Sequence, residues 1–388
     1  MIVTPLPRQY YSKWTEISPA ALEHNLKRLK EACQFPQTQI MGVVKANAYG
    51  HNVSQVAPVL WRAGVTHFGV ATLGEALYLR QILPQAEHIL ILGALTTDQY
   101  HLALEEGFAF MLHTLSHLPI LEGLASSTGK TAEVHLKVDT GMGRVGIRPE
   151  EMGQALDQLA ATERINLSGI CSHLATSDRP NCPHIARQLK IFAEVVAYAQ
   201  GHLREPAALM YHIANSDAVF QYPEAHYNLV RPGISLYGYG GIPGLDLKPA
   251  LALKAQITQL KAVPSGTALG YGRTFVTERP SRIGVIAIGY ADGLNRLLSN
   301  RQEVLLRGMR LPLVGRISMD QAAIDLTDLS PAVSEGEIVT LIGTEGQESI
   351  TAQDWADKLQ TIPYEVLTSL GTRLPRWSTK PPQNPDQI

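Results

Sequence analysis

Residues 40–50 read IMGVVKANAYG, a short apolar run that ends in a lysine and a polar turn. An apolar run of this length before polar and glycine residues is typical of a buried β-strand. The run therefore places Lys45 at the C-terminal end of a strand. Similar runs recur along the chain as far as residue 240, and amphipathic stretches separate most of them.

Working outward from this run, the sequence contains eight candidate strands. They are Ile40–Lys45, His67–Thr72, Ile89–Gly93, Ala109–His113, Glu133–Asp139, Leu167–His173, Leu209–Ile213 and Tyr227–Arg231. A first helix is expected to begin at Ser18-Pro19, because proline is favoured at the first helical position. Further helices are predicted at Gly74–Ile82, Glu150–Ala160 and Ile185–Ala199. Eight such βα repeats predict an α/β fold of the (β/α)8-barrel type.

The pattern changes near Gly238–Pro249, and residues of alternating polarity then dominate. This alternation predicts a second, mainly antiparallel β domain, in which only Ala352–Leu359 reads clearly as helix. We expect residues 12–240 to form the barrel and cofactor-binding domain. Residues 241–388 would form the β domain, joined by residues 1–11. Pro381–Ile388 reads as a loose tail.

Composition favours a soluble protein without a polyanionic partner. The chain has 388 residues, of which 45% are hydrophobic and 18% charged, with a formal net charge of −2. These values give no reason to expect binding to nucleic acid or to an anionic membrane. The three cysteines have no framework spacing, which fits a reducing compartment. No apolar run is long enough for a membrane span and the start lacks a signal-peptide pattern, so we expect a cytoplasmic protein.

Polar side chains gather at the ends of the predicted strands. In a barrel of this type, the C-terminal ends of the strands carry the active site. The residues found there are Lys45, Lys137, Arg144, His173, His212, Asn215, Ser216 and Arg231. They would form a cationic, hydrogen-bonding cup that suits a phosphorylated cofactor together with an amino acid.

Lys45 is the candidate for covalent chemistry. A lysine directly after an apolar strand is partly desolvated, which lowers its pKa and makes a neutral amine available for imine formation. A single strand-end lysine more often simply extends to solvent. The interpretation therefore depends on the neighbouring motifs.

Two other patterns have less support. Gly141, Gly143 and Gly146 form a G-x-G-x-x-G match, but it follows the fifth strand rather than the first, so we reject dinucleotide binding. The glycines more plausibly let the backbone turn and aim Arg144 into the cup. A set of four residues alternates cysteine and histidine, but its spacing is too tight for a zinc site. The set is Cys171, His173, Cys182 and His184, and we expect no metal.

Taken together, seven motifs resemble those of the alanine racemase family, in order and along nearly the whole chain. They are 44–51 (VKANAYGH), 137–144 (KVDTGMGR), 214–216 (ANS), 230–238 (VRPGISLYG), 270–272 (GYG), 289–293 (GYADG) and 318–321 (SMDQ). The resemblance implies pyridoxal 5'-phosphate as cofactor. It also implies a homodimer in which each β domain completes the partner's active site.

The resemblance also implies individual roles. Lys45 would hold the cofactor, and Tyr271 would reach in from the other subunit as the second catalytic base. The residues around the cofactor would be Tyr49, Leu92, His173, Asn215, Ser216, Arg231, Gly233 and Ile234. Arg144 and the backbone N–H of Met319 would hold the substrate carboxylate. The supporting residues would be Lys137, which is carbamylated in many relatives, and His212, Tyr290 and Asp320.

One position departs from the family pattern. Some relatives have a phosphate-contacting tyrosine just before the final Arg-x-Pro-Arg, where this chain has Thr372 before Arg373-Leu374-Pro375-Arg376. A threonine is much shorter, so we leave Thr372 out of the candidate site.

The expected reaction is the interconversion of L-alanine and D-alanine, which supplies D-alanine for peptidoglycan. Two bases, Lys45 and Tyr271, would move the proton on opposite faces of a pyridoxal phosphate aldimine. Arg231 would face the pyridine nitrogen and, because arginine does not readily give up its proton, leave the ring a weak electron sink. The alternatives are a serine or broad-specificity racemase, a decarboxylase, and a non-catalytic pyridoxal phosphate carrier. A decarboxylase would be expected to pair that nitrogen with an acid, and a carrier usually lacks the second domain.

Overall fold

The computed structural model describes residues 7–242 and 244–379, which form two compact units. One unit is Ala21–Lys248, and the other combines the described residues up to Ala20 with those from Pro249 onward. The unit Ala21–Lys248 thus begins nine residues after the expected residue 12 and ends eight residues after the expected residue 240. The cause at the N-terminal side is strand β1 (Lys13–Ile17), which pairs with the sheet of the second unit. The expected tail at Pro381–Ile388 lies outside the described residues.

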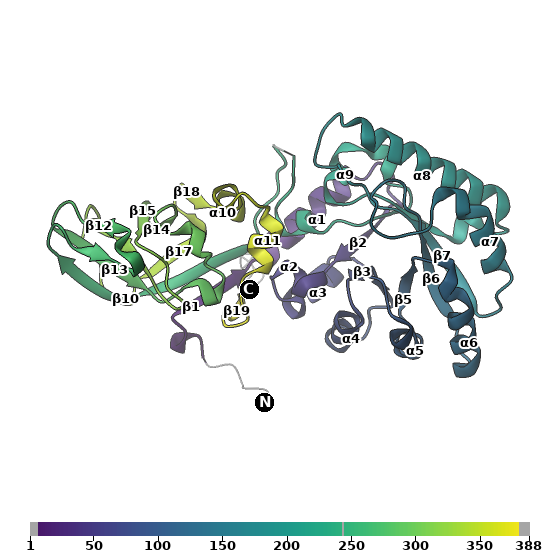
Figure 1. The fold of residues 1–388 in the computed structure, drawn as a ribbon, viewed down its shortest axis with the longest axis horizontal. Helices are drawn as coiled ribbons and strands as arrows, with labels where there is room; N and C mark the ends of the chain where they lie inside the picture. The colour runs from purple at the N-terminus through teal and green to yellow at the C-terminus, as the bar shows by residue number, and fades with distance from the viewer. Residues whose placement is uncertain (1–6, 243, 380–388) are drawn as a thin grey trace, which may run out of the picture. The chain divides into compact units, whose positions relative to one another are not determined.

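The first unit is built on eight parallel strands, which confirms the predicted (β/α)8 barrel. In spatial order they run β8-β7-β6-β5-β4-β3-β2-β9. Their bounds are β2 (Gln39–Val43), β3 (His67–Val70), β4 (His88–Ile91), β5 (Ala109–Leu112), β6 (Ala132–Lys137), β7 (Ile165–Cys171), β8 (Met210–His212) and β9 (Leu229–Val230). Helices lie outside these strands (Figure 1).

Between β8 and β9 the barrel closes through one side chain and a backbone hydrogen bond just beyond the strands, from Arg231 N–H to the carbonyl of Ala214 at 3.0 Å. The backbone ladder does not join these two strands in the described structure. Instead, the amide of Asn228 accepts from the N–H of Tyr211 at 2.7 Å and donates to the carbonyl of Leu209 at 2.7 Å. This side chain therefore satisfies backbone groups that a longer β9 would otherwise pair.

The interior of the barrel is a packed core. One buried cluster takes a residue from each of five strands, namely Met41, Leu90, Met111, Cys171 and Leu229. All five are at most 4% exposed, so the barrel is filled rather than hollow at this level. The polar residues at the strand ends follow directly after these packed strands, so the core holds the backbone from which they project.

The helices of this unit bury one face each against the strands. They are α1 (Pro19–Ala32), α3 (Val53–Arg62), α4 (Leu73–Ile82), α5 (Thr97–Glu105), α6 (Leu118–Thr128), α7 (Met152–Ala160), α8 (Pro183–His202) and α9 (Ser216–Gln221). In α1, Leu22, Leu26 and Leu29 are fully buried, as their spacing predicts.

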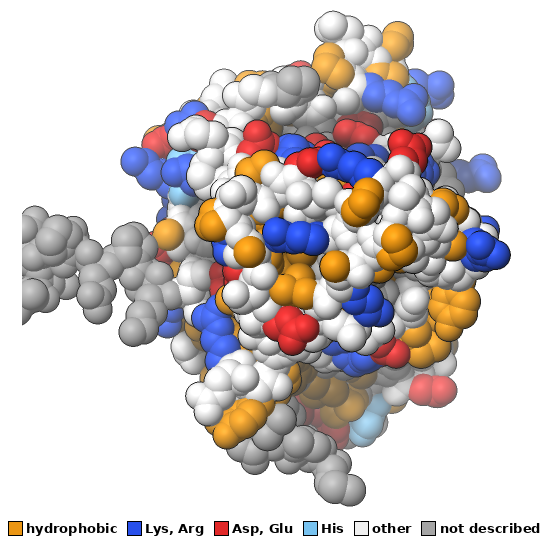
Figure 2. Space-filling model, turned by 90° about the vertical axis from the view of Figure 1, so that its left-hand side faces the viewer, with side chains coloured by type: hydrophobic (Ala, Val, Ile, Leu, Met, Phe, Trp, Pro, Cys, Tyr) orange, Lys and Arg blue, Asp and Glu red, His pale blue; other side chains and the backbone are white. Residues whose placement is uncertain are grey.

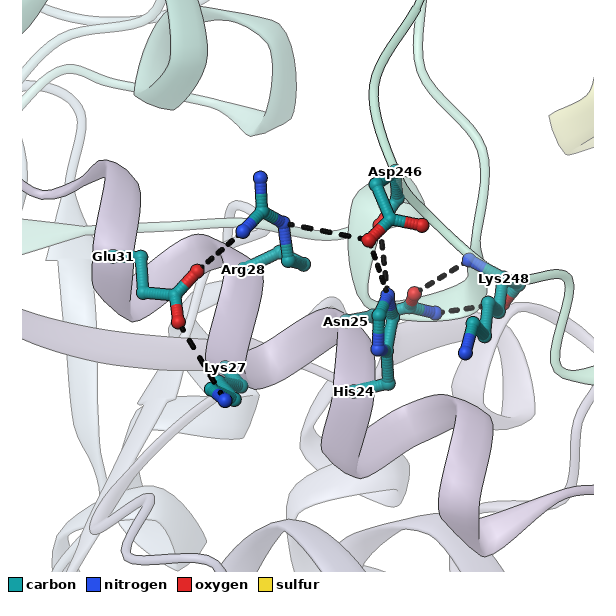
Figure 3. A network of polar contacts seen from close by, with 7 residues as sticks. All are labelled: His24, Asn25, Lys27, Arg28, Glu31, Asp246 and Lys248. Carbon is teal, nitrogen blue, oxygen red and sulfur yellow. Dashed lines mark hydrogen bonds and ion pairs between the residues drawn. The ribbon is translucent and has the colours of Figure 1, made fainter.

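Helix α1 also fixes the segment that leaves the barrel. Asn25 is completely buried, and its side chain pairs in both directions with the backbone of Lys248, at 2.7 and 2.8 Å. Around this pair, His24 and Arg28 approach Asp246, and Arg28 bonds Glu31 (Figure 3). The exposed ion pairs add little stability, whereas the buried amide holds residues 246–248 against the helix.

The second unit confirms the expected mainly antiparallel β domain. Its nine-stranded sheet has the order β18-β17-β14-β15-β16-β13-β10-β1-β19, and only β1 and β19 are parallel. The strands beyond β1 are β10 (Leu251–Val263), β13 (Ser281–Ile286), β14 (Glu303–Leu306), β15 (Met309–Val314), β16 (Ala322–Asp325), β17 (Ile338–Glu345), β18 (Glu348–Ile350) and β19 (Arg376–Ser378). A two-stranded hairpin, β11 (Ala268–Leu269) and β12 (Phe275–Val276), and two helices, α10 (Ala352–Leu359) and α11 (Pro363–Thr368), complete it.

The surface carries both charge signs. On the face shown in Figure 2, lysine and arginine side chains alternate with aspartate and glutamate, and no large area has one sign. This agrees with the net charge of −2. Within the described ranges, no helix combines the length and the apolar character that crossing a bilayer requires.

Candidate active site

Five of the predicted residues form one electrostatic cluster at the C-terminal ends of the barrel strands. Lys45 follows β2, Lys137 ends β6, and Arg144 lies in the loop after β6. His173 follows β7 and Arg231 follows β9. The charges of Arg231, Lys137, Arg144 and Lys45 all act on His173, and together with its burial they hold its pKa well below the usual range. Burial is the largest cause, so His173 is neutral at pH 7.

Lys45 opens a turn of unusual backbone geometry, α2 (Lys45–Tyr49). Ala46, Asn47, Ala48 and Tyr49 all have φ between 51° and 55°, which is left-handed helical backbone. For residues other than glycine this conformation costs about 1–2 kcal/mol each. A strained turn directly after a reactive residue must be held by its surroundings.

Glu75 and Asn47 hold this turn. One oxygen of the Glu75 carboxylate accepts from the N–H of Ala46 at 2.7 Å, and the other accepts from Ala71 at 2.7 Å and Thr72 at 3.3 Å. Asn47 Oδ1 accepts from the N–H of Val53 at 2.9 Å. Glu75 therefore ties the residue after Lys45 to the end of β3.

The Lys45 amine has a lowered pKa. Burial is the largest cause, and the positive charge of Arg144 acts in the same direction. The carboxylate of Glu75 opposes the shift, and Arg231 adds to it. The net effect makes the neutral, nucleophilic amine more available than in an exposed lysine.

Arg231 is buried in the middle of the barrel mouth, with a relative exposure of 6%. Its Nη1 donates to Nδ1 of His212 at 2.5 Å, and its Nη2 donates to the carbonyl of Ser172 at 2.7 Å. His173 Nδ1 lies 3.4 Å from the same Nη2. These partners are neutral groups, so among the described residues no carboxylate pairs with the positive charge of this guanidinium.

Lys137 is also buried, and burial lowers the pKa of its amine to about 8. The nearby Arg231 and Arg144 act in the same direction, whereas Cys171 and Asp139 oppose them. A substantial fraction of this amine is therefore neutral near pH 8, although it lies among cations.

The loop after β6 presents Arg144 at the surface. The carboxylate of Asp139 accepts from the N–H groups of Gly141, Met142 and Gly143 at 2.8–3.1 Å. Gly141 and Gly143 have φ of +135° and +69°, which only glycine adopts readily. The loop geometry thus agrees with the expectation that the glycines serve a sharp turn. Arg144 itself is exposed, which leaves its fork free to meet a ligand.

The segments after β8 and β9 carry hydrogen-bonding groups of the kind that can bind a phosphate. Ser216 Oγ accepts from the N–H of Gly233 at 2.9 Å and of Ser235 at 3.3 Å. A Cβ at Gly233 would overlap the Tyr49 hydroxyl, so glycine is required for this approach. Ile234 follows in a short 3-10 helix, and Asn215 caps α9 by accepting from Ala218 at 3.3 Å.

These residues fit a pyridoxal phosphate. The tight cradle at Gly233 suits a phosphate group, and a buried guanidinium with only neutral partners suits a ring nitrogen that accepts a hydrogen bond. The positive charges of Arg144 and Arg231 both act on the amine of Lys45. Leu92, just after β4, packs against the core cluster and supplies an apolar wall.

Four predicted residues lie in the second unit. Tyr271, Met319 and Tyr290 are 68%, 51% and 42% exposed. Tyr290 and Ala291 donate their N–H groups to the carbonyls of Ser318 and Met319, both at 3.0 Å, so these two loops form one surface. Asp320 accepts from Arg373 at 2.7 Å. Thr372, the departure from the family pattern, is exposed.

Sequence reasoning missed two residues that matter at the site. Glu75 lies three residues after Thr72, a spacing that signals a capping box, but the signal does not reveal the extra contact with Ala46. His135 lies two residues before Lys137 on β6, so it shares the inward face of the strand. It contacts His212 at 2.8 Å.

Across the residues that the structure describes, no three His, Cys, Asp or Glu side chains are grouped as metal ligands.

The fold and the site define a class: a (β/α)8 barrel with a lysine in a cationic, phosphate-sized cup, followed by a β domain. The family models name it more closely. The model described as alanine racemase, N-terminal domain, matches residues 17–240, and the model for the C-terminal domain matches residues 250–378. The chain belongs to the alanine racemase family.

Individual relatives agree over nearly the full length. Alanine racemase 2 of Caldanaerobacter subterraneus is 41% identical over 368 residues, covering 93% of each chain. The alanine racemase of Nostoc sp. is 40% identical and covers 94% of this chain and 95% of the relative. Among solved structures, the Bacillus anthracis alanine racemase with bound L-Ala-P has a TM-score of 0.88 at 33% identity, covering 97% and 96% of the two chains.

A second solved structure bears on the cofactor. Alanine racemase from Bartonella henselae, described with covalently bound pyridoxal phosphate, has a TM-score of 0.84 at 32% identity. It covers 95% of this chain and all of the other.

Proposed function

We propose that the protein interconverts L-alanine and D-alanine with pyridoxal 5'-phosphate as cofactor. The observation that carries this proposal is the buried Arg231, held by His212 at the floor of a cup that also contains Lys45. Within the family to which the chain belongs, this arrangement favours reversible proton transfer at the α-carbon.

Bound pyridoxal phosphate supplies an electron sink that makes the α-proton of alanine acidic. The side chains of this protein must then remove that proton from one face and return one to the other. Lys45 is the base on one face, because burial and the nearby guanidinium groups lower its pKa. The partner subunit's Tyr271 is the base on the opposite face.

The floor of the cup sets the outcome of the reaction. Arg231 can only donate a hydrogen bond, so it leaves the cofactor's ring nitrogen without a proton. Arg231 would thus leave the bound cofactor a weak electron sink, which favours return of a proton to the α-carbon over transamination. A decarboxylase would be expected to pair the ring nitrogen with an acid in place of Arg231.

The rim of the cup holds the substrate and the phosphate. Arg144 grips the carboxylate of alanine with two parallel hydrogen bonds, and the backbone N–H of the partner's Met319 adds a third. A carbamate on Lys137 would place a negative charge near Arg144 and orient it. The groups proposed to surround the phosphate are Tyr49, Asn215, Ser216, Gly233 and Ile234, with His173 and Leu92 beside the ring and His212 behind Arg231.

The exposure of the β-domain residues supports the sharing of sites between two subunits. Tyr271 is two-thirds exposed in its own unit, although a base needs a desolvated, oriented position. A homodimer would cover Tyr271, Met319 and Tyr290 by placing them against the partner's barrel, with Asp320 bracing the loop. We further propose a cytoplasmic enzyme that supplies D-alanine for peptidoglycan.

A panel of L-amino acids tests the activity. Purified protein with added pyridoxal phosphate should abolish the optical rotation of L-alanine, and L-serine and larger amino acids should react much more slowly. Comparable rates across the panel would support the broad-specificity alternative. Cofactor binding without loss of rotation from any amino acid would support the non-catalytic carrier, and carbon dioxide release would support a decarboxylase.

A further inference from the structure

A line of three buried side chains runs from the floor of the cup into the barrel. Arg231 Nη1 lies 2.5 Å from His212 Nδ1, and His212 Nε2 lies 2.8 Å from His135 Nδ1. Arg231 and His135 are each 6% exposed, and His212 is fully buried. The sequence analysis names His212 as a supporting residue but does not name His135.

The hydrogen bonds at both ends of His212 set the position of its ring proton. A guanidinium can only donate, so Nδ1 of His212 accepts as long as the contact with Arg231 holds. Burial, followed by the charge of Arg231, holds the pKa of His212 well below its usual range, so this histidine is neutral. Its one ring proton is then on Nε2, and Nδ1 of His135 is the acceptor for it. Burial, with His67 and Arg231, lowers the pKa of His135 to about 3, which keeps that acceptor available.

We propose that His135 is a positioning residue for the cofactor's ring nitrogen. By accepting the Nε2 proton of His212, it fixes the tautomer that presents Nδ1 to Arg231, and so aims the guanidinium upward into the cup. The expected effect of His135 on the reaction rate rests on the proposed function. The tautomer itself does not depend on that function.

The strand next to β6 is shaped to admit the His135 ring. The register between β6 and β7 shifts between Val134 and His135, which marks a β-bulge, and His135 then pairs with Gly169. A Cβ at Gly169 would overlap Nδ1 of His135 and lie 2.7 Å from its Cε1. Bulge and glycine together make room at the atom that accepts the proton.

The competing explanation is that His135 only fills space in the barrel. Two substitutions separate these explanations. In His135→Asn, the side-chain oxygen can take the place of Nδ1 and accept the proton, although the side chain is smaller. In His135→Leu, the volume is better preserved but no acceptor remains. A cavity of about 420 Å³ that His135 itself lines gives either side chain room to adjust.

The first measurement is nitrogen-15 NMR of the histidine rings in the full-length protein without cofactor. Protonated and unprotonated ring nitrogens have well-separated shifts, and His212→Gln identifies the signals of His212. Wild type and His135→Asn should show His212 protonated at Nε2 only. In His135→Leu the buried Nε2 proton loses its acceptor, so the Nδ1-protonated tautomer, which gives up the hydrogen bond to Arg231, should appear beside the first. A single Nε2-protonated form in His135→Leu, or its loss in His135→Asn, would overturn the proposal.

The second measurement is racemisation by the cofactor-saturated variants. Molecules with the other tautomer lose the hydrogen bond between His212 and the charged Arg231, and such a bond is worth enough that kcat should fall about tenfold or more in His135→Leu. His135→Asn should stay within about threefold of wild type, and KM for alanine should change little in either. Equal kcat values in the two variants would show a space-filling role. An inactive wild type would refute the proposed function and leave the NMR result to decide the tautomer.

Discussion

The lowered pKa of Lys45 can be tested by the pH dependence of cofactor binding. In the proposed function Lys45 would bind the cofactor aldehyde through its neutral amine, with loss of water, and a lowered pKa moves that neutral form to lower pH. The rate of cofactor uptake by the apoprotein should therefore rise with pH, with a midpoint below about 10.4, the value of an ordinary lysine. Stopped-flow absorbance between pH 6 and 10 measures it. Borohydride followed by peptide mass analysis should find the label on Lys45, and a label on Lys137 would contradict the assignment.

Arg144 is exposed and has no role in the core, so its substitution tests ligand binding directly. Arg144→Lys keeps the charge but loses the two-pronged geometry. We expect KM for alanine to rise about tenfold, which corresponds to about 1.4 kcal/mol. Arg148→Lys, on the same loop, is the matched control and should leave KM unchanged. Steady-state kinetics check both, and unchanged KM in Arg144→Lys would make this arginine structural.

Lys137 should form a carbamate. Its neutral amine attacks carbon dioxide, a nitrogen–carbon bond forms, and the amine proton goes to solvent. The pKa of about 8 means that, at fixed carbon dioxide, the adduct should increase steeply as the pH rises through 8, and because its formation also releases a proton, it should keep increasing above pH 8 until Lys137 is fully converted. Carbon-13 NMR with labelled bicarbonate detects it, and Lys137→Ala should lose the signal. A signal that persists in that variant would come from another amine.

At the scale of elements, the left-handed turn after Lys45 is the feature most open to test. Glu75→Ala removes a capping-box contact of α4 and also the acceptor for Ala46. Gln99→Ala removes the corresponding contact in α5, where Gln99 accepts only from Thr96. Both should lose about 1 kcal/mol of unfolding free energy. Only Glu75→Ala should also lower cofactor affinity, by about tenfold or more, as measured by fluorescence titration. Equal affinities would show that the turn holds without Glu75.

The same turn shows where sequence reasoning stops. Periodicity located every barrel strand to within a few residues, because buried parallel strands are continuous apolar runs. It did not reveal four consecutive left-handed residues, since alanine and tyrosine carry no signal for that backbone. Nor did it find β15 or α11 in the β domain, or β1, whose five residues precede a strong helix start.

At the scale of the candidate site, motifs identified the residues on the strand ends but not their supports. Lys45, Lys137 and Arg231 follow from position on a strand. Glu75 and His135 act through contacts between segments 29 and 77 residues apart, and a single sequence carries no record of such pairs.

For the molecule as a whole, shared sites make a definite prediction. Lys45→Ala and Tyr271→Phe homodimers should each be inactive. A mixed dimer has one site with both wild-type residues, so mixing the two variants should restore about a quarter of wild-type activity at random exchange, because half of the dimers are mixed. Activity of the mixture and mass analysis of the dimers check it. Mixed dimers without activity would refute sharing.

Strand β1 pairs on one side with β10 and on the other with β19, so the two ends of the chain lie next to each other in one sheet. β1 ends at Ile17 and β19 begins at Arg376. At about 10 residues per second, a ribosome needs on the order of half a minute to make the chain between them. While the barrel of Ala21–Lys248 is being made, β1 lacks both neighbours, and β10 is the first of them to follow. The nascent chain must therefore keep one edge of β1 open from the synthesis of β10 until β19 is made.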